Sequence, residues 1–431
     1  MKFVDLQVCW PRMLSRMALG LLLLLWLQAI GAETTVPLAL SDAERIALEN
    51  DPLVRARMAR SEALDADAVA DGQLPDPKFR TGLYNVPLDD FDLRREPSTQ
   101  LRFGIQQAFP RGKTLELKSQ KTHLQAQAER TRAKLESLKI LRNVRKTYLD
   151  IYYQTEAARI VTESRKLFES LAEITQVQYG SGGSSQQDVL RAELELSRLD
   201  DRITQIQTRE EMARAKLSRW LGQAAWRKLQ RAAPSLPRPA DEKEIEAVLE
   251  QHPEIRLQSN IVATHQQAVA ISREQYKPGW TIGAEYRMRF GDNPDDSSRS
   301  DMGTVMLAVD MPLFSEKRQD KRLAASQKRA DAAYLDRQNS WRMLRELLAS
   351  ASSSRERLEE RLQRYQQQLI REAEENAKAA LLAYQSGTIE FTGLMRARIT
   401  ELEIHLQALK LRFGLMKIHA DLLYLAAGEE Q

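Results

Sequence analysis

The stretch Lys113–Tyr179 (KTLELKSQKTHLQAQAERTRAKLESLKILRNVRKTYLDIYYQTEAARIVTESRKLFESLAEITQVQY) contains neither glycine nor proline, and Gly112 and Gly180 stand at its two ends. At about 1.5 Å per residue, a single helix of this length would be roughly 100 Å long, which no compact domain requires. Its apolar residues recur every three or four positions, as at Leu141 and Val144, which is the narrow stripe of helices packed side by side. The stretch therefore predicts a tube or a rod rather than a pocket.

The elements predicted around this stretch occur twice along the chain, so each half is a structural repeat. The first repeat, residues 33–222, predicts helices, a β-hairpin over 79–109, the long helix over 113–179 and a return helix over 186–221. After a proline-containing linker over 223–241, the second repeat, residues 242–431, predicts a β-hairpin over 280–313, a long helix over 315–386 and a return helix over 388–427. A period of this length indicates a duplicated half rather than a solenoid, because solenoid units are much shorter.

The N-terminus predicts export. Residues 1–32 have the pattern of a secretory signal peptide, with Arg12 and Arg16 before the apolar run Met17–Ile30. The chain's one cysteine, Cys9, lies in this leader, so the mature protein would contain no disulfide and no thiolate metal site. The net charge of +4 over 431 residues does not suggest a nucleic-acid partner.

The predicted strands alternate between apolar and polar residues, which gives each strand one face of each kind. In the second hairpin, Trp280, Ile282 and Tyr286 alternate with Thr281 and Glu285. Strands of about 9–11 residues can cross a bilayer at a tilt. Four strands cannot close a membrane barrel, so the chain must obtain strands from other copies. The expected fold is a mixed α/β membrane protein, whose duplicated β-hairpins and long α-helical hairpins form a trimeric 12-stranded outer-membrane β-barrel continued by a periplasmic α-helical barrel.

Two stretches have the sequence and spacing of a known family. Gln106–Lys113 (QQAFPRGK) leads from a predicted strand into the first long helix, and Tyr179 is followed, after a glycine turn, by Asp188–Glu193 (DVLRAE). With the duplicated layout, these residues make nearly the whole mature chain resemble the TolC family of outer-membrane efflux proteins. The resemblance implies a homotrimeric channel-tunnel in outer-membrane lipid that extends into the periplasm. It also implies docking onto a periplasmic adaptor (a membrane fusion protein) and an inner-membrane pump of the RND type.

The cargo is less narrowly indicated than the architecture. The Gly112-Lys113 opening of the first long helix, and the end of the chain soon after the second return helix, resemble the CzcC-like branch that serves heavy-metal cation pumps. Drug-exporting and polypeptide-exporting relatives share the same frame, so these cargoes stay open as alternatives. A passive duct needs no energy source of its own, because the pump supplies it.

The two predicted helix reversals are candidates for contact with the adaptor. The first contains Gly182 and Gly183, and the second contains Gly387 and Thr388. The resemblance implies that these turns are the tips that meet the adaptor. The alternative is that glycine is present only because a tight helix reversal requires a positive φ.

Four further residues are candidates for a gate at the periplasmic entrance. The resemblance implies a hydrogen bond between Asp188 and Tyr384 that holds the entrance closed; the alternative is that Asp188 only favours a helix N-terminus. Some relatives carry two acidic residues, three apart, that form a ring after the second turn, but the matching positions here are Gly393 and Arg396. Glu390 could supply a three-fold acidic ring instead, or it could simply be solvated.

No catalytic or cofactor-binding motif appears in the sequence, so an enzyme is not expected. The five histidines are scattered without ligand spacing, and no metal site is expected from them. Four methionines of the second hairpin could offer soft sulfur to Cu(I), or could face lipid: Met288, Met302, Met306 and Met311. The remaining alternative is a periplasmic coiled-coil adaptor or structural protein, which should have one helical hairpin beside small β-domains instead of two hairpins beside two strand pairs.

Overall fold

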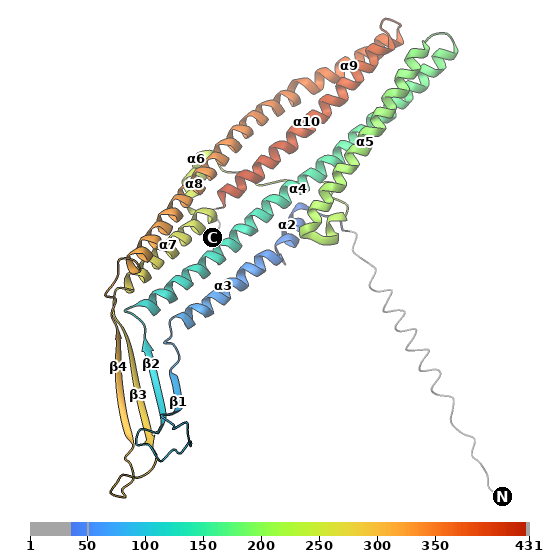
Figure 1. The fold of residues 1–431 in the computed structure, drawn as a ribbon. Helices are drawn as coiled ribbons and strands as arrows, with labels where there is room; N and C mark the ends of the chain where they lie inside the picture. Colours follow the sequence, from blue (N-terminus) through green and yellow to red (C-terminus); the bar gives the residue numbers. More distant parts are fainter. Residues whose placement is uncertain (1–35, 50, 428–431) are drawn as a thin grey trace, which may run out of the picture.

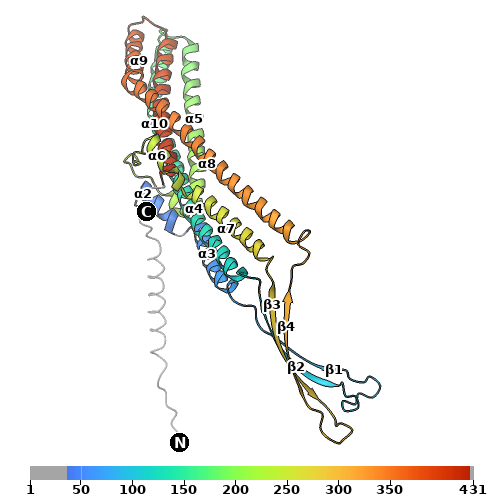
Figure 2. The ribbon, with the colours of Figure 1, turned by 90° about the vertical axis from the view of Figure 1, so that its left-hand side faces the viewer.

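The computed structural model describes residues 36–49 and 51–427, and the signal peptide expected over 1–32 lies outside this part of the chain. The molecule is elongated, with a four-stranded sheet at one end (Figure 1). Two helical hairpins run from the middle of the molecule to two tips, and Figure 2 shows both tips at the end opposite the sheet.

The two halves of the chain contain the same succession of elements. The first half consists of α2 (Leu40–Glu49), α3 (Pro52–Asp71), β1 (Lys78–Tyr84), β2 (Gln100–Phe109), α4 (Thr114–Gly180), α5 (Gln186–Leu221) and a 3-10 turn (Gly222–Trp226). The second half consists of α6 (Glu242–Val248), a 3-10 turn (Leu249–Gln251), α7 (Pro253–Glu274), β3 (Gly279–Arg289), β4 (Met302–Asp310), α8 (Gln319–Arg364), the π turn η3 (Tyr365–Leu369), α9 (Ile370–Gln385) and α10 (Phe391–Ala426).

The sheet joins the two halves through its central strands. Its order is β1-β2-β3-β4 and every pair is antiparallel, so β2 of the first half pairs with β3 of the second. In β3 the side chains of Trp280, Ile282 and Tyr286 are exposed, whereas Thr281 and Glu285 on the other face are partly covered. The expected alternation therefore produces one exposed apolar face and one polar face.

The methionines of the second hairpin do not form one cluster. Met288 lies on the apolar face of β3, whereas Met302 and Met306 pair with Arg287 and Gly283 and lie on the polar face. The sheet separates these sulfur atoms because consecutive strand residues point to opposite faces. The arrangement does not provide the soft metal site considered from the sequence.

Four helices next to the sheet form a layer in the order α3-α4-α7-α8. On one side of α4 lies the segment that contains α2: Tyr148 Oη donates to the carbonyl oxygen of Leu38, just before α2, at 2.8 Å, and Arg145 pairs with Glu44 of α2 at 2.7 Å. Tyr148 lies in a core with Leu149 and Leu217, all of them less than 2% exposed. Among the described residues, the helices include none with an apolar run long enough to cross a membrane.

The duplication is visible in how α3 and α7 begin. Asp51 caps α3 by accepting hydrogen bonds from Leu53 N and Val54 N, and a proline follows it. His252 caps α7 in the same place: its Nδ1 accepts from Glu254 N at 3.2 Å, and its Nε2 lies 3.1 Å from the Tyr424 carbonyl oxygen. Burial lowers the pKa of His252, so the neutral imidazole accepts the first bond and donates the second.

The second long helix differs from the single helix expected over 315–386. It begins at Gln319 and is interrupted by η3, in which the Ile370 N–H donates to the Tyr365 carbonyl oxygen. Four of the covered positions here are four residues apart, a spacing that drifts by about 40° per step around an ideal helix: Tyr365, Leu369, Ala373 and Ala377. A π turn contains one residue more than an α-helical turn. The additional residue rotates the covered side chains that follow it back toward the partner helix.

Candidate functional site at the two helical tips

The two tips are built by the same backbone motif. Gly182 and Gly387 have positive φ angles of 78° and 74°. The next amide in each turn, Gly183 N or Thr388 N, donates to a carbonyl oxygen five residues earlier at 2.8 Å. This 6→1 bond beside a left-handed residue is the Schellman ending of a helix, and it satisfies the last free carbonyl groups of α4 and α9.

The backbone conformation requires glycine at Gly182 and Gly387 but not at Gly183. A side chain added at Gly182 or Gly387 would meet no atom within 4 Å, so the positive φ alone requires glycine there. Gly183 has no positive φ, and Thr388 occupies the equivalent position of the second tip. Both turns are exposed and present mainly backbone and small polar side chains, which leaves them accessible to another protein.

Asp188 is engaged in capping its own helix. Its carboxylate accepts hydrogen bonds from Ser185 Oγ at 2.7 Å and from Ser185 N at 3.3 Å. Ser185 Oγ in turn accepts from Asp188 N at 3.2 Å, which completes a capping box at the start of α5. Within the chain, Asp188 therefore makes the contacts of a residue that stabilises a helix N-terminus.

Tyr384 joins the two hairpins through a residue that the sequence did not indicate. Its hydroxyl donates to Gln178 Oε1 at 2.6 Å, and its ring packs edge-on against Phe391 with centroids 5.7 Å apart. Gln178 belongs to α4 and Tyr384 to α9, so the bond ties one tip to the other. The expected hydrogen bond between Asp188 and Tyr384 is not formed within the chain: the Asp188 carboxylate is bound at Ser185, and the Tyr384 hydroxyl donates to Gln178.

The second tip lacks the cap of the first. Glu390 occupies the N-cap position of α10 but its side chain makes no capping bond, and Thr392 Oγ1 donates to it at 3.4 Å. Gly393 stands where Asp188 stands in the first tip, each six residues after its positive-φ glycine. Arg396 is exposed, and no hydrogen bond or ion pair joins it to Glu390 among the described residues. Both Glu390 and Arg396 are free to face solvent or another chain.

Because the two halves of the chain repeat, residues of one tip have equivalents in the other. Tyr179 and Tyr384 precede the turns at equivalent positions, and Arg191 and Arg396 follow them at equivalent positions on the return helices. Tyr179 is 48% exposed, whereas Tyr384 is partly buried. The two halves therefore share a tip scaffold but differ in which tyrosine is used to hold the hairpins together.

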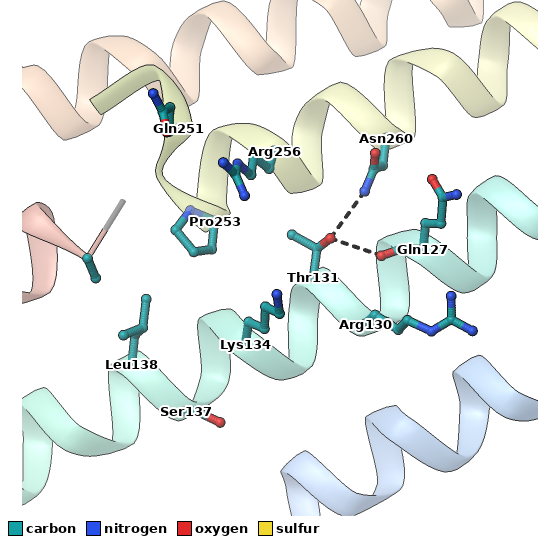
Figure 3. A pocket seen from close by; sticks show the side chains of 11 residues that line it. Gln127, Arg130, Thr131, Lys134, Ser137, Leu138, Gln251, Pro253, Arg256 and Asn260 are labelled. Atoms are coloured by element: carbon teal, nitrogen blue, oxygen red, sulfur yellow. Dashed lines mark hydrogen bonds between the residues drawn. The ribbon is translucent and has the colours of Figure 1, made fainter. Parts of the chain in front are cut away.

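A polar recess lies between α4 and α7, away from the tips (Figure 3). Its volume is about 520 Å³, and its lining includes Arg130, Lys134 and Arg256. At its centre Asn260 Nδ2 donates to Thr131 Oγ1 at 3.2 Å (Figure 3). Thr131 Oγ1 also donates to the Gln127 carbonyl oxygen at 2.9 Å, and the one serine of the lining, Ser137, donates to the Ala133 carbonyl oxygen at 3.1 Å, so neither hydroxyl is bonded to a base that could activate it.

Comparison with known proteins gives matches in structure only. No family model matches the sequence, and no curated protein matches it. The chain is similar to the outer membrane protein VceC of the bacterial pathogen Vibrio cholerae, with a TM-score of 0.75 and 17% identity over 90% of this chain and 95% of that one. It is similar to the CmeC outer membrane channel of Campylobacter jejuni, with a TM-score of 0.76 and 13% identity over 91% of this chain and 87% of that one.

A third match is the open state of the MtrE outer membrane channel of Neisseria gonorrhoeae, with a TM-score of 0.72 and 16% identity over 90% of this chain and 88% of that one. This chain has the outer-membrane channel fold. Because the matches cover about nine tenths of the chain, the channel fold includes both strand pairs and both helical hairpins. A coiled-coil adaptor with a single hairpin does not have this arrangement.

Proposed function

We propose that the chain is one subunit of a homotrimeric outer-membrane channel of the TolC family. In this proposal, residues 1–32 direct export, and residues 33–222 and 242–431 form two repeats joined by the linker 223–241. Three copies form a 12-stranded barrel in the outer membrane and a helical tube in the periplasm. The trimer is a passive exit duct without cofactor or catalytic activity, and a periplasmic adaptor and an inner-membrane pump of the RND type deliver the cargo.

The observation that carries the proposal is the open sheet. Its outer strands β1 and β4 each have one edge without a partner strand within the described residues. Its apolar face is exposed to a degree that is unusual for a protein in water, with Phe79 67%, Leu307 62% and Val305 82% exposed. Edge-to-edge joining of three copies would close the barrel and place this face against lipid. The strand edges would then be paired, and the apolar face would no longer contact water.

Heavy-metal cations remain one candidate cargo, on the strength of the sequence resemblance. Drugs or polypeptides remain the other, since the outer-membrane channel fold does not itself choose between them. Within the described residues, no group of three or more histidine, aspartate or glutamate side chains is placed to hold a metal ion. A duct does not need to bind its cargo tightly. Which cargo passes is therefore expected to depend on the charge of the lumen.

We place the adaptor contact at the two tips and the gate at the bond between them. The exposed turns at Gly182-Gly183 and Gly387-Thr388 are the adaptor surface in this proposal. The hydrogen bond from Tyr384 to Gln178 holds the hairpins together, and Asp188, Glu390 and Arg396 surround the entrance.

We expect Tyr384→Phe to favour the open entrance, because it removes the hydrogen bond to Gln178 and preserves the ring. A loss of about 1 kcal/mol would raise the ratio of open to closed tips about fivefold. The open probability of single channels in planar bilayers measures this change. Tyr179→Phe is the matched control, since Tyr179 is the equivalent tyrosine and the structure records no side-chain hydrogen bond for it among the residues described. An equal open probability of the two variants would show that the bond from Tyr384 to Gln178 does not hold the entrance closed.

The proposal itself is tested by membrane fractionation and native mass analysis of the detergent-extracted protein. The expected result is a trimer in the outer-membrane fraction. A soluble monomer in the periplasm would mean that the strand pairs do not build a barrel, and the duct would have to be abandoned.

A further inference from the structure

The polar face of the sheet carries an excess of positive charge. The strand register places on this face every second residue of each strand, and its cationic members are Lys78, Arg80, Arg102, Arg287 and Arg289. The carboxylates on the same face are Glu285 and Asp310. Five cations and two anions leave a net charge of +3 on this face in each chain.

The contacts on this face do not neutralise the excess. Arg102 and Arg287 are direct register partners, and they share Glu285, which lies 3.9 Å from Arg102 Nη1 and bonds to Arg287 Nε. The Arg102 guanidinium also stacks on the Tyr84 ring, 4.0 Å from its centroid. Lys78 and Arg80 have no ion-pair partner among the residues that the structure describes. One shared carboxylate between two guanidinium groups leaves this row of the sheet positive.

The same sign continues where the helices begin. A groove of about 520 Å³ at the start of α8 is lined by five cations, Lys317, Arg318, Lys321, Arg322 and Arg329, and by no carboxylate. The nearby carboxylate of Asp320 is bound elsewhere, because it accepts a hydrogen bond from Tyr276 Oη at 2.5 Å. A neighbouring groove shares Arg329 and reaches Arg132 on α4, with Glu129 as its only carboxylate. The basic surface thus runs from the strands onto the helix layer.

On α4, this surface lies on the side opposite to α2. Gln125 and Arg132, which line the neighbouring groove, are about half a turn around α4 from Tyr148, whose face α2 covers. In the sheet, the opposite face is the apolar one that would contact lipid. In the proposed trimer, this side of the helices and the polar face of the sheet would line the water-filled interior.

We propose that the trimeric duct, on which this inference rests, has a basic lumen that favours anions and that its cargo is anionic. Three chains would bring about nine net positive charges to the strand region alone, facing one another across a confined water column. Charges of one sign in a channel with low-dielectric walls reinforce each other and raise the local concentration of counter-ions. This lumen favours anionic drugs or polypeptides over free heavy-metal cations.

Two acidic loops lie beyond the strands and have the opposite sign. Residues 85–99 and 290–301 together contain eight carboxylates and three guanidinium groups, a net charge of −5 per chain. Asp89 and Asp90 are paired with Arg95 at 2.7 Å and 2.6 Å. The loops are exposed to bulk water at the mouth, where salt screens charges beyond about 8 Å. The confined lumen, rather than the open mouth, is expected to decide which ion passes.

Reversal potentials of purified trimer in planar bilayers of neutral lipid, under a potassium chloride gradient, test this inference. The expected result is a chloride-to-potassium permeability ratio above one. The double variant Lys78→Glu with Arg80→Glu reverses two cations of the polar face that have no ion-pair partner, and it should lose or invert the preference. Lys243→Glu is the matched control, because Lys243 is exposed on α6, away from the strands, and its variant should keep the preference.

The results of this experiment test the basic lumen and the proposed duct separately. Absence of any channel conductance would count against the duct itself. Conducting channels that prefer potassium would overturn the basic lumen and leave the duct standing. A chloride preference that survives Lys78→Glu with Arg80→Glu would show that the charge of the sheet's polar face does not set the selectivity, and this result would also overturn the inference.

Discussion

Val305→Lys is expected to abolish assembly of the proposed trimer in the outer membrane. Val305 lies on the apolar face of β4, opposite Ala284, and its side chain is 82% exposed in the isolated chain. A lysine on the lipid face of a barrel costs about 2–4 kcal/mol near the middle of the bilayer. The substitution occurs once in each chain, so a trimer would carry this cost three times. The yield of heat-sensitive trimer in the outer-membrane fraction, seen on semi-native gels, measures the effect.

Thr304→Lys is the matched control for this prediction. Thr304 is the adjacent residue of the same strand, but it pairs with Glu285 on the polar face. A lysine there would face the water-filled lumen beside a carboxylate, and trimer yield should stay near that of the unchanged protein. Equal loss of trimer in both variants would contradict the assignment of the two faces, and equal tolerance would contradict the lipid contact.

Asp421→Ala is expected to lower the free energy of unfolding by about 3 kcal/mol. Lys146 Nζ lies 2.7 Å and 3.0 Å from the two carboxylate oxygens of Asp421, and Arg142 Nε lies 3.9 Å away. The Asp421 side chain is 13% exposed, so removing it leaves two cations partly buried without their anion. Breaking a buried pair costs about 3–5 kcal/mol, and the low end applies because Lys146 is 37% exposed and keeps some contact with water.

Urea unfolding of the detergent-solubilised protein, followed by far-ultraviolet circular dichroism, measures this loss. The control is Asp331→Ala, which removes the partner of Lys328 in a pair whose side chains are 61% and 85% exposed. Such a surface pair contributes about 0–1 kcal/mol. The double variant Asp421→Ala with Lys146→Met should recover part of the loss, because it removes the unpaired cation as well. Equal costs for Asp421→Ala and Asp331→Ala would contradict the prediction.

The elements with strong local signals could be predicted from the sequence. The absence of glycine and proline between Gly112 and Gly180 predicts a helix of the length of α4, and strict alternation predicts the two faces of β3. The glycines at 182 and 387 mark the reversals because a left-handed residue is needed there. Each of these signals depends on neighbouring residues only, which is why a single sequence contains it.

The features that depend on distant partners could not be predicted in this way. The bond from Tyr384 to Gln178 joins residues 206 positions apart, and the ion pair between Lys146 and Asp421 joins residues 275 positions apart. No periodicity or motif connects such residues, so Gln178 was missed as a partner and Asp188 was expected in its place. The π turn η3 was missed for a related reason, since it depends on how a drifting apolar stripe meets its partner helix.

The pairing of β2 with β3 has a consequence for when the sheet can form. Gln100 pairs with Arg289, so the central seam of the sheet joins residues that are separated by the whole first helical hairpin. Closing so long a loop is slow compared with forming a local hairpin. In the proposed export, the first strand pair would therefore wait, without its partner strand, until β3 (Gly279–Arg289) has been translocated. In this interval the unpaired edge of β2 is open to pairing with a wrong strand.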